Sequence, residues 1–451
     1  MVYAAALGAQ GICMLIGGVV EQKVGPKVTV ALGGTILCIG TFLAAGATTL
    51  SEFIWYDGIF FGVGMGIAYT APITCAIRWL PGEKGRVTGS IVAGFGGGAL
   101  IFNQIAGHIL NPNNESPTIE EESGTYFSSD SSVAQHVPTL YTVLGCCYTA
   151  FFVVGVMLTR DPETHEMPLV SIPPNGMHGS PVPTGREGTR SISLSPARSD
   201  DDLDEVIDNP AEDGRTGTGM SSHVYTGAMF NPLPQKLVKD LELAPVDIAV
   251  SPLSWQLAAC FFLTTTGGMY FAGTFKTYGF NYFADDELLT NLATLSSLFN
   301  AGGRIGWGAL GDRYGYATTL VYMATGFGII QLTYPLSVSF GVTGFCTWTL
   351  LLFLFEGGNF CLYVPLLVGL FGVKHSAANY GLIFTVYSIL NVTNIGILSS
   401  MQATFVEAAL YCSLLVFCGV LLVMHLCLKV GWPVRGLDSI LDRLRFQFVM
   451  T

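Results

Sequence analysis

Charged residues are scarce in this chain of 451 residues. Asp, Glu, Lys and Arg together make up 12% of it and hydrophobic residues 50%, whereas charged residues account for roughly 25% of a soluble domain. The mean hydropathy is +0.52. A chain with so few charges cannot cover its own surface in water. The composition therefore excludes a soluble globular protein and predicts an integral membrane protein.

Motifs and clusters that enzymes and ATP-driven pumps need are also absent from the sequence. It contains no Gly-x4-Gly-Lys-Ser/Thr segment to cradle the phosphates of ATP. Its hydrophobic segments hold no clustered histidines and no nucleophile–base pair. All 11 cysteines, from Cys13 to Cys427, lie in hydrophobic segments, which argues against a disulfide framework or a zinc site. We therefore expect a protein that is not an enzyme and has no metal and no cofactor.

Long apolar runs are what the sequence does contain. We identify eleven runs of roughly 20 apolar residues, the length that crosses ~30 Å of hydrocarbon as a helix. They cover residues 3–20, 28–49, 54–77, 87–109, 139–158, 253–274, 288–309, 317–337, 342–372, 378–400 and 404–428. Backbone polar groups in lipid must be satisfied within their own segment, so these runs are expected to be helices. The predicted fold class is an all-α polytopic membrane protein.

Basic residues give the expected orientation. Of the 20 Lys and Arg residues, all except Lys276 and Arg304 fall on one side of the predicted spans. The positive-inside rule makes that side cytoplasmic, so we expect a cytoplasmic C-terminus, in a plasma or organelle membrane. The net charge of -12 comes largely from two acidic loops, 115–130 and 200–212, and is interpreted as solvated loop charge. We expect a monomer in a lipid bilayer, with no nucleic-acid partner.

The apolar pattern divides the chain into four parts. Residues 1–159 and 251–429 are expected to form an N-terminal and a C-terminal helical bundle. Residues 160–250 are rich in Pro, Ser, Gly and acidic residues, which predicts a disordered cytoplasmic linker, either a simple tether or a regulatory phosphorylation segment. Residues 430–451 are expected to form a cytoplasmic tail with a short interfacial helix, because apolar residues recur there at helical spacing.

Two glycine-rich turns, one in each half, share a spacing. The second turn has Gly308, Asp312, Arg313 and Gly315, and the first has Gly18, Gly25 and Lys27, with Gln22 at the position of the Asp. Glycines allow two helix ends to approach closely, and the Asp can sit at a helix N-terminus and pair with Arg. These turns resemble the gating loop motif that the major facilitator superfamily places after its second and eighth helices.

Three further segments carry a more detailed resemblance. Residues 66–72 (GIAYTAP), 78–86 (RWLPGEKGR) and 93–103 (AGFGGGALIFN) resemble the oxalate/formate antiporter family, a neighbour of the monocarboxylate transporters within that superfamily. The resemblance implies two six-helix bundles that move small organic anions by alternating access. Because the first turn would follow the second helix of this fold, we expect eleven spans to be present and the first helix to be missing. An incomplete gene model and a truncated isoform both remain open.

Arg304 is the most informative residue for function. It stands eight positions before Asp312, which at 1.5 Å per residue places it ~12 Å deep, close to the midplane. A cation at that depth should face the bundle interior, where it either pairs with an acid or binds an anionic ligand. The resemblance implies a substrate-binding arginine at this position of the eighth span.

Glu356 is the second deep charge, in the middle of the predicted span 342–372. A carboxylate there could be the ion-pair partner of Arg304, a proton carrier for symport, or a group with only a packing role. All three interpretations remain open, because the sequence does not show what surrounds the side chain.

The number of deep cations bears on the substrate. No Lys or Arg occurs between Lys374 and Lys429, whereas the resemblance to oxalate carriers implies a second basic residue there. One cation fits one carboxylate, so we expect a monocarboxylate such as pyruvate, lactate or formate. An oxalate-type dicarboxylate exchanger, and a non-transporting sensor signalling through the linker, remain alternatives.

The predicted substrate site contains one charged residue and five uncharged ones: Arg304, Asn300, Tyr69, Phe95, Tyr387 and Asn391. Tyr387 and Asn391 lie four residues apart on one helical face and could hydrogen-bond a carboxylate. Tyr69 and Phe95 occupy positions where the resemblance implies aromatic walls. For each aromatic residue, packing and substrate contact remain alternatives.

Overall fold

The computed structural model describes residues 2–112, 119–121, 124–128, 130–162, 242–283, 285–400 and 404–434. The chain divides into two compact units. The first comprises Met1–Pro168 and Phe230–Thr451 and contains every described residue; the second, Leu169–Met229, lies outside them. The predicted tail helix, and most of the predicted linker, also lie outside the described residues.

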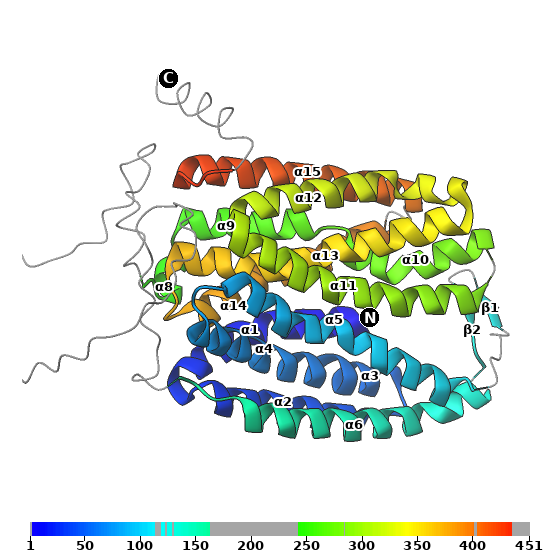
Figure 1. Ribbon diagram of the computed structural model, residues 1–451. Coiled ribbons are helices and arrows are strands. Elements are labelled where there is room, and N and C mark those ends of the chain that lie inside the picture. The colour runs from blue at the N-terminus through cyan, green and yellow to red at the C-terminus, as the bar shows by residue number, and fades with distance from the viewer. Residues whose placement is uncertain are drawn as a thin grey trace, which may run out of the picture. The chain divides into compact units, whose positions relative to one another are not determined.

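The first half of the chain forms the helices that we call the N-terminal bundle (Figure 1). They are α1 (Val2–Val24), α2 (Pro26–Ala44), α3 (Leu50–Phe53), the π-helical η1 (Ile54–Phe60), α4 (Phe61–Trp79), α5 (Lys84–Leu110) and α6 (Ser132–Leu158). A short antiparallel hairpin, β1 (Ile119–Glu121) and β2 (Gly124–Tyr126), pairs Ile119 with Tyr126 between α5 and α6. Helix α2 begins at Pro26, directly after Gly25 with φ 81°, as expected of a proline at the first helical position.

The second half forms the C-terminal bundle. It comprises α8 (Pro245–Ala249), α9 (Pro252–Thr265), α10 (Gly268–Phe283), α11 (Asp286–Tyr314), α12 (Tyr316–Thr333), the 3₁₀ helix η2 (Tyr334–Phe340), α13 (Gly341–Phe371), α14 (Ser376–Ser400) and α15 (Phe405–Val430). Apart from the hairpin, the regular structure of the described residues is helical. The predicted all-helical architecture is therefore confirmed.

The expected eleven spans can be compared with the lengths and hydropathy of the observed helices. Eight helical segments of the described chain are long and apolar enough to cross a membrane, judged by length and composition. One expected span is divided between α9 and α10, which have 14 and 16 residues. Helix α11 is less apolar, since it carries Asn291, Asn300 and Arg304, and α12, η2 and α13 form one continuous segment, Tyr316–Phe371. The eleven-span count stays a prediction.

The break between α9 and α10 lies at Thr266 and Gly267. Gly267 has φ +94°, a conformation that glycine adopts readily. A Cβ at this position would lie 2.9 Å from the side chains of Cys412 and Gln331. Gln331 of α12 donates its Nε2–H to the carbonyl of Thr266 at 3.0 Å and so satisfies one backbone group that the interruption leaves unpaired.

Both ends of the predicted 160–250 linker make defined contacts. At its start, the carbonyl of Arg160 accepts a hydrogen bond from Trp79 Nε1 at 2.8 Å. At its end, residues 245–249 form α8, and Ile248 is fully buried. The backbone of Leu243 also bonds to Phe371. The ordered C-terminal bundle therefore begins before residue 251, because apolar Ile248 is buried within it.

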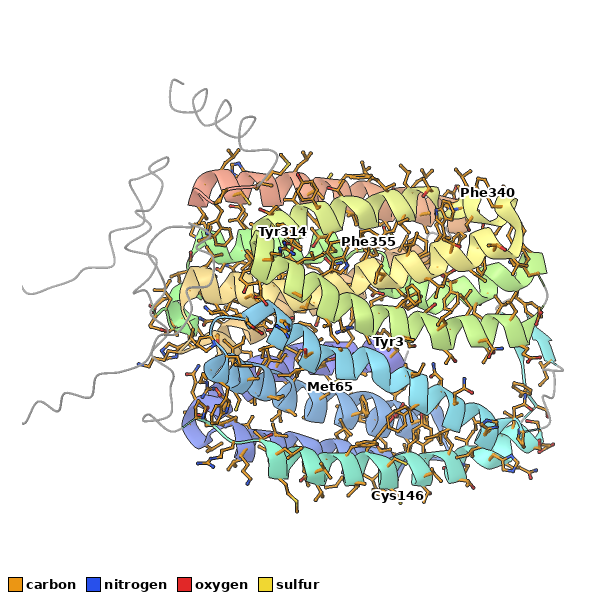
Figure 2. The ribbon with its side chains drawn as sticks, viewed as in Figure 1. Tyr3, Met65, Cys146, Tyr314, Phe340 and Phe355 are labelled. Atoms are coloured by element: carbon orange, nitrogen blue, oxygen red, sulfur yellow. The ribbon has the colours of Figure 1, made fainter. Side chains whose placement is uncertain are left out.

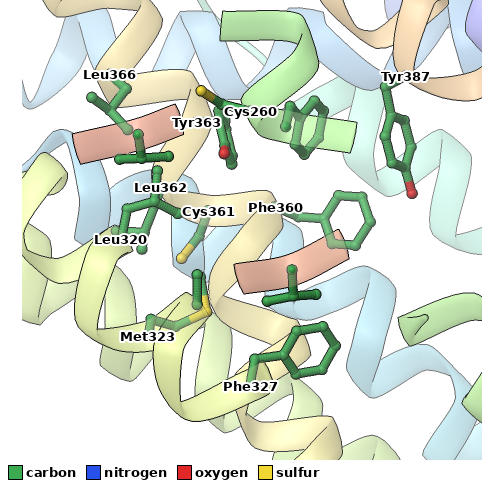
Figure 3. Close-up of a cluster of buried hydrophobic side chains, with 14 of the residues drawn as sticks. Cys260, Leu320, Met323, Phe327, Phe360, Cys361, Leu362, Tyr363, Leu366 and Tyr387 are labelled. Carbon is green, nitrogen blue, oxygen red and sulfur yellow. The ribbon is translucent and has the colours of Figure 1, made fainter. Parts of the chain in front are cut away.

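Helix α13 is the centre of the C-terminal bundle. Its residues from Glu356 to Phe371 are buried except Gly369. Figure 3 shows Phe360, Cys361, Leu362 and Tyr363 of α13 among side chains of neighbouring helices, including Cys260, Leu320, Met323 and Phe327. A helix that is apolar on every side is expected only where other helices surround it. This packing fixes the positions of Glu356 and Phe360.

Candidate functional site

Arg304 lies on α11 and is 5% exposed. Its Nε–H donates to Asn300 Oδ1 at 2.9 Å, and its guanidinium carbon lies 5.6 Å from the ring centre of Phe95 and 5.2 Å from that of Phe360. The ion pairs found among the described residues join Arg78 to Glu21 and Asp161, and Arg86 to Glu83. Arg304 is in none of them. Two aromatic rings partly offset the cost of burying this cation, and no carboxylate of the described residues lies within ion-pair distance of it.

Asn300 positions Arg304. Its Nδ2 donates to the carbonyl of Phe353 on α13 at 3.2 Å, while its Oδ1 accepts from Arg304. A Cβ at Gly96 of α5 would lie 2.7 Å from Asn300 Oδ1 and 3.3 Å from Arg304 Nε. Glycine is required there because α5 passes directly over the Asn300–Arg304 pair. Asn300, predicted as a substrate ligand, has both polar atoms of its amide engaged by the protein.

Aromatic side chains from both bundles meet beside Arg304. Tyr69 on α4 lies edge-on to Phe95 on α5, with ring centres 6.4 Å apart, and 6.2 Å from Phe384 on α14. The Tyr69 side chain also interacts electrostatically with Arg304. The structure thus brings Tyr69, Phe95 and Arg304 together, as the sequence predicts.

Tyr387 and Asn391 lie on α14 and are both buried. Tyr387 stacks on Phe261 of α9 with ring centres 4.5 Å apart. Its hydroxyl and the Asn391 Nδ2 have no hydrogen-bond partner among the described residues. Unpartnered buried donors are costly, and a polar ligand would satisfy them.

Glu356 lies on α13 and is 7% exposed. It forms no ion pair within the described part of the chain, so it is not the salt-bridge partner of Arg304. Its carboxyl group instead contacts Gly268, the first residue of α10. Of the three interpretations left open by the sequence, ion pairing with Arg304 is thus not supported.

The turn that contains Asp312 joins the two bundles. Asp312 Oδ1 accepts from the backbone N–H of Gly85 at 2.8 Å, and Oδ2 from that of Arg86 at 2.7 Å. Both donors belong to the first turn of α5, whose positive end favours a carboxylate. Asp312 thus lies at a helix N-terminus, as the sequence predicts. Among the described residues it forms no ion pair with an arginine, and the guanidinium of Arg313 lies 5.3 Å from the ring of Tyr314.

Glycines of the two turns are placed for close packing. Gly308 lies against the backbone of Gly85, and Gly18 lies against the backbone of Ala378 on α14. Gly25 and Gly315 both have positive φ, 81° and 93°, where each turn reverses the chain. Lys27 is exposed at the start of α2.

Several residues near the site escape prediction from sequence. Phe360 and Phe261 lie in apolar runs where one phenylalanine resembles any other. Gln331 is fully buried with an unpartnered Oε1. Tyr3 of α1 donates its hydroxyl to Met269 Sδ at 2.7 Å and lies centrally in Figure 2. A lone polar residue in an apolar run was the available signal for Gln331.

Comparisons with known proteins identify the family of the chain. The sequence matches the Major Facilitator Superfamily over residues 1–393. It is 25% identical over 405 residues to apicoplast pyruvate carrier 1 of Toxoplasma gondii, covering 85% of this chain and 66% of that protein. It is 20% identical over 390 residues to the oxalate:formate antiporter of Oxalobacter formigenes, covering 86% and 72%. The chain thus spans slightly under two thirds of the pyruvate carrier's length.

Solved structures show the same fold. The E. coli fucose:proton symporter superposes with a TM-score of 0.56 at 11% identity, covering 94% of this chain and 89% of that one. The match over most of the sequence and the shared helical architecture lead to one conclusion: the chain is an integral multi-pass membrane protein and belongs to the Major Facilitator Superfamily, a family of transporters and not of enzymes.

Proposed function

We propose that the chain transports small monocarboxylate anions by alternating access, with Arg304 as the group that binds the carboxylate. The observation that carries the proposal is a buried guanidinium without a carboxylate partner, held by Asn300 between Phe95 and Phe360. A guanidinium can grip a carboxylate with two parallel hydrogen bonds. An anionic substrate would therefore supply the direct ion-pair partner that the described residues do not.

The number of cations supports a substrate with one carboxylate. Among the described residues, Arg304 is the only Lys or Arg that is buried. A second carboxylate at this site would remain unneutralised in a medium of low dielectric, where an unpaired charge is costly. Pyruvate, lactate and formate satisfy this condition, whereas oxalate does not. The relatives that are named for pyruvate or for oxalate and formate support a small carboxylate as the substrate class.

The position of the site supports alternating access. Arg304 lies on α11 of the C-terminal bundle, and Phe95 and Tyr69 lie on α5 and α4 of the N-terminal bundle. A ligand held by groups from both bundles is exposed to one side or the other when the bundles rock about it.

Uptake of labelled pyruvate into proteoliposomes tests the proposal. Arg304→Ala is expected to reduce exchange at least about a hundredfold, since a hydrogen-bonded buried charge pair contributes roughly 3 kcal/mol or more. Arg304→Lys should restore little, because an ammonium lacks the planar fork. Lys429→Ala, which removes an exposed cation at the end of α15, is the matched control. Exchange by Arg304→Ala at the wild-type rate would remove Arg304 from the site, and pyruvate binding without exchange in the wild type would favour a sensor.

A further inference from the structure

The break between α9 and α10 forms a second polar site near Arg304. The carboxyl group of Glu356 reaches the break from α13 and contacts Gly268, where a Cβ would overlap Glu356 Oε1. Gln331 reaches the adjacent Gly267 from α12. Two side chains from different helices thus converge on two consecutive glycines. The interruption of the helix makes room for these side chains, so it is a specific feature of the packing.

Two unused polar groups mark this break as a binding site. Gln331 is fully buried, and its Oε1 has no hydrogen-bond partner among the described residues. Glu356 is 7% exposed and forms no ion pair there either. Both groups present acceptor oxygens to the break. A buried acceptor without a donor, next to a carboxyl group without an ion-pair partner, favours the binding of a proton or another cation.

The groups that face Glu356 can be named for each neighbouring helix. Arg304 on α11 acts on the carboxyl group electrostatically, as do Tyr3 on α1 and Tyr387 on α14. Helix α10 contributes Gly268 and helix α12 contributes Gln331. Cys412 of α15 adjoins the break at Gly267. Arg304 is therefore the one cation in this set.

The sum of the buried charges distinguishes a proton-binding role of Glu356 from a role in packing alone. The buried charged residues of the described chain are Glu21, Arg304 and Glu356, and Glu21 is paired with Arg78. The remaining two, one positive and one negative, sum to zero. A carboxylate bound at Arg304 would leave this interior with one excess negative charge, which is costly away from water. A proton added to Glu356 restores neutrality.

We propose that Glu356 is the proton-coupling site: one proton adds to its carboxylate when one substrate carboxylate binds at Arg304, and both are released on the other side. The inference rests on the proposed transport of monocarboxylates. The proton adds to a carboxylate oxygen and leaves from it, so no oxidant or other reactant is needed. Transport is then electroneutral, since one proton accompanies one anion.

Glu356→Gln separates coupling from transport, because Gln is a neutral mimic of the protonated side chain. In proteoliposomes that contain a pH-sensitive dye, we expect Glu356→Gln to keep pyruvate exchange within about threefold of the wild type, since the loaded, neutral carrier still moves in both directions. Pyruvate-driven proton influx and net uptake driven by a proton gradient should both fall at least about tenfold. Glu356→Asp should recover part of both. Glu407→Gln, which keeps the N-terminal cap of α15, is the matched control.

Each outcome bears on one of the two proposals. Absence of pyruvate exchange by the wild type contradicts the proposed function. Wild-type exchange together with proton-coupled net uptake by Glu356→Gln overturns the coupling site. Loss of exchange by a Glu356→Gln protein that melts at the wild-type temperature also overturns the coupling site. Net uptake by the wild type that follows a sodium gradient and does not depend on pH overturns it as well.

Discussion

The α5–α11 pair and the α1–α14 pair both join the N-terminal bundle to the C-terminal bundle, and both do so through glycines. Gly308 lies against the backbone of Gly85 in one pair, and Gly18 lies against that of Ala378 in the other. The side chains at the turns differ. Asp312 accepts two backbone N–H groups at the start of α5, whereas Gln22 Oε1 meets His375 Nδ1 at 3.0 Å, just before α14.

The Asp312 contact and the Gln22–His375 contact differ in the charge of the accepting side chain and in its exposure to solvent. The Asp312 contact joins a carboxylate to the positive end of a helix, and Tyr316 donates a third hydrogen bond to it at 2.6 Å. Charge-assisted bonds of this kind are about twice as strong as neutral ones. The Gln22–His375 contact is a single bond between exposed side chains. We therefore expect the α5–α11 pair to control when this end of the protein opens, and the α1–α14 pair to follow it.

Removing the Asp312 carboxylate should have the largest effect on this contrast. Asp312→Ala leaves the N–H groups of Gly85 and Arg86 without their acceptor, a loss of about 1–3 kcal/mol for each group that stays unsatisfied. We expect pyruvate exchange to fall at least about tenfold and the melting temperature to drop. Asp247→Ala, which removes an exposed carboxylate from the short α8, is the control. Equal effects of the two variants would contradict the special role of the α5–α11 contact.

The backbone packing of the same pair can be altered without touching charge. A Cβ at Gly89 would overlap the carbonyl of Arg304, whereas Gly94 has open space around its Cβ position. Overpacking costs about 1–3 kcal/mol, so Gly89→Ala should separate α5 from α11, lower the melting temperature and displace Arg304. We expect exchange to fall roughly tenfold in Gly89→Ala and to stay near the wild-type rate in Gly94→Ala.

The smallest expected effect comes from giving the Gln22–His375 contact a carboxylate like the one in the Asp312 contact. Gln22→Asp places a carboxylate beside His375 near the start of α14. An exposed charge at a helix N-terminus contributes about 0.3–1 kcal/mol, so exchange should slow by roughly two- to fivefold. His375→Ala in the same background should reverse part of the change. A faster Gln22→Asp carrier would show that the second contact does not restrain opening.

The fold class and the proposed site residue Arg304 follow from local features of the sequence. Apolar runs of sufficient length must form helices, because lipid offers no partners to the backbone. The depth of Arg304 follows from its distance to the turn at Asp312. Its neighbours Tyr69 and Phe95 were predicted from the resemblance of their segments, and the structure does bring them to Arg304.

Contacts across helices could not be predicted in the same way. Asp312 was expected at a helix N-terminus, and the structure shows that this helix is α5, more than two hundred positions away. Asn300 also bonds to the carbonyl of Phe353 on α13, a contact that depends on how two helices pack; its role in binding substrate stays a prediction. Nothing in the run 253–274 fixed which of its glycines would break the helix, since that depends on Gln331 and Cys412 from other helices.

The sequence by itself determined that this protein is helical, lies in a membrane and has a single deep cation, because hydrophobicity and backbone hydrogen bonding act within each segment. Only the tertiary structure decided that Arg304 and Glu356 stay apart, that Glu356 reaches the α9–α10 break, and that one inter-bundle contact is charged and the other neutral. Those outcomes depend on which helix faces come together, and side-chain partners from distant segments meet only after the helices have packed.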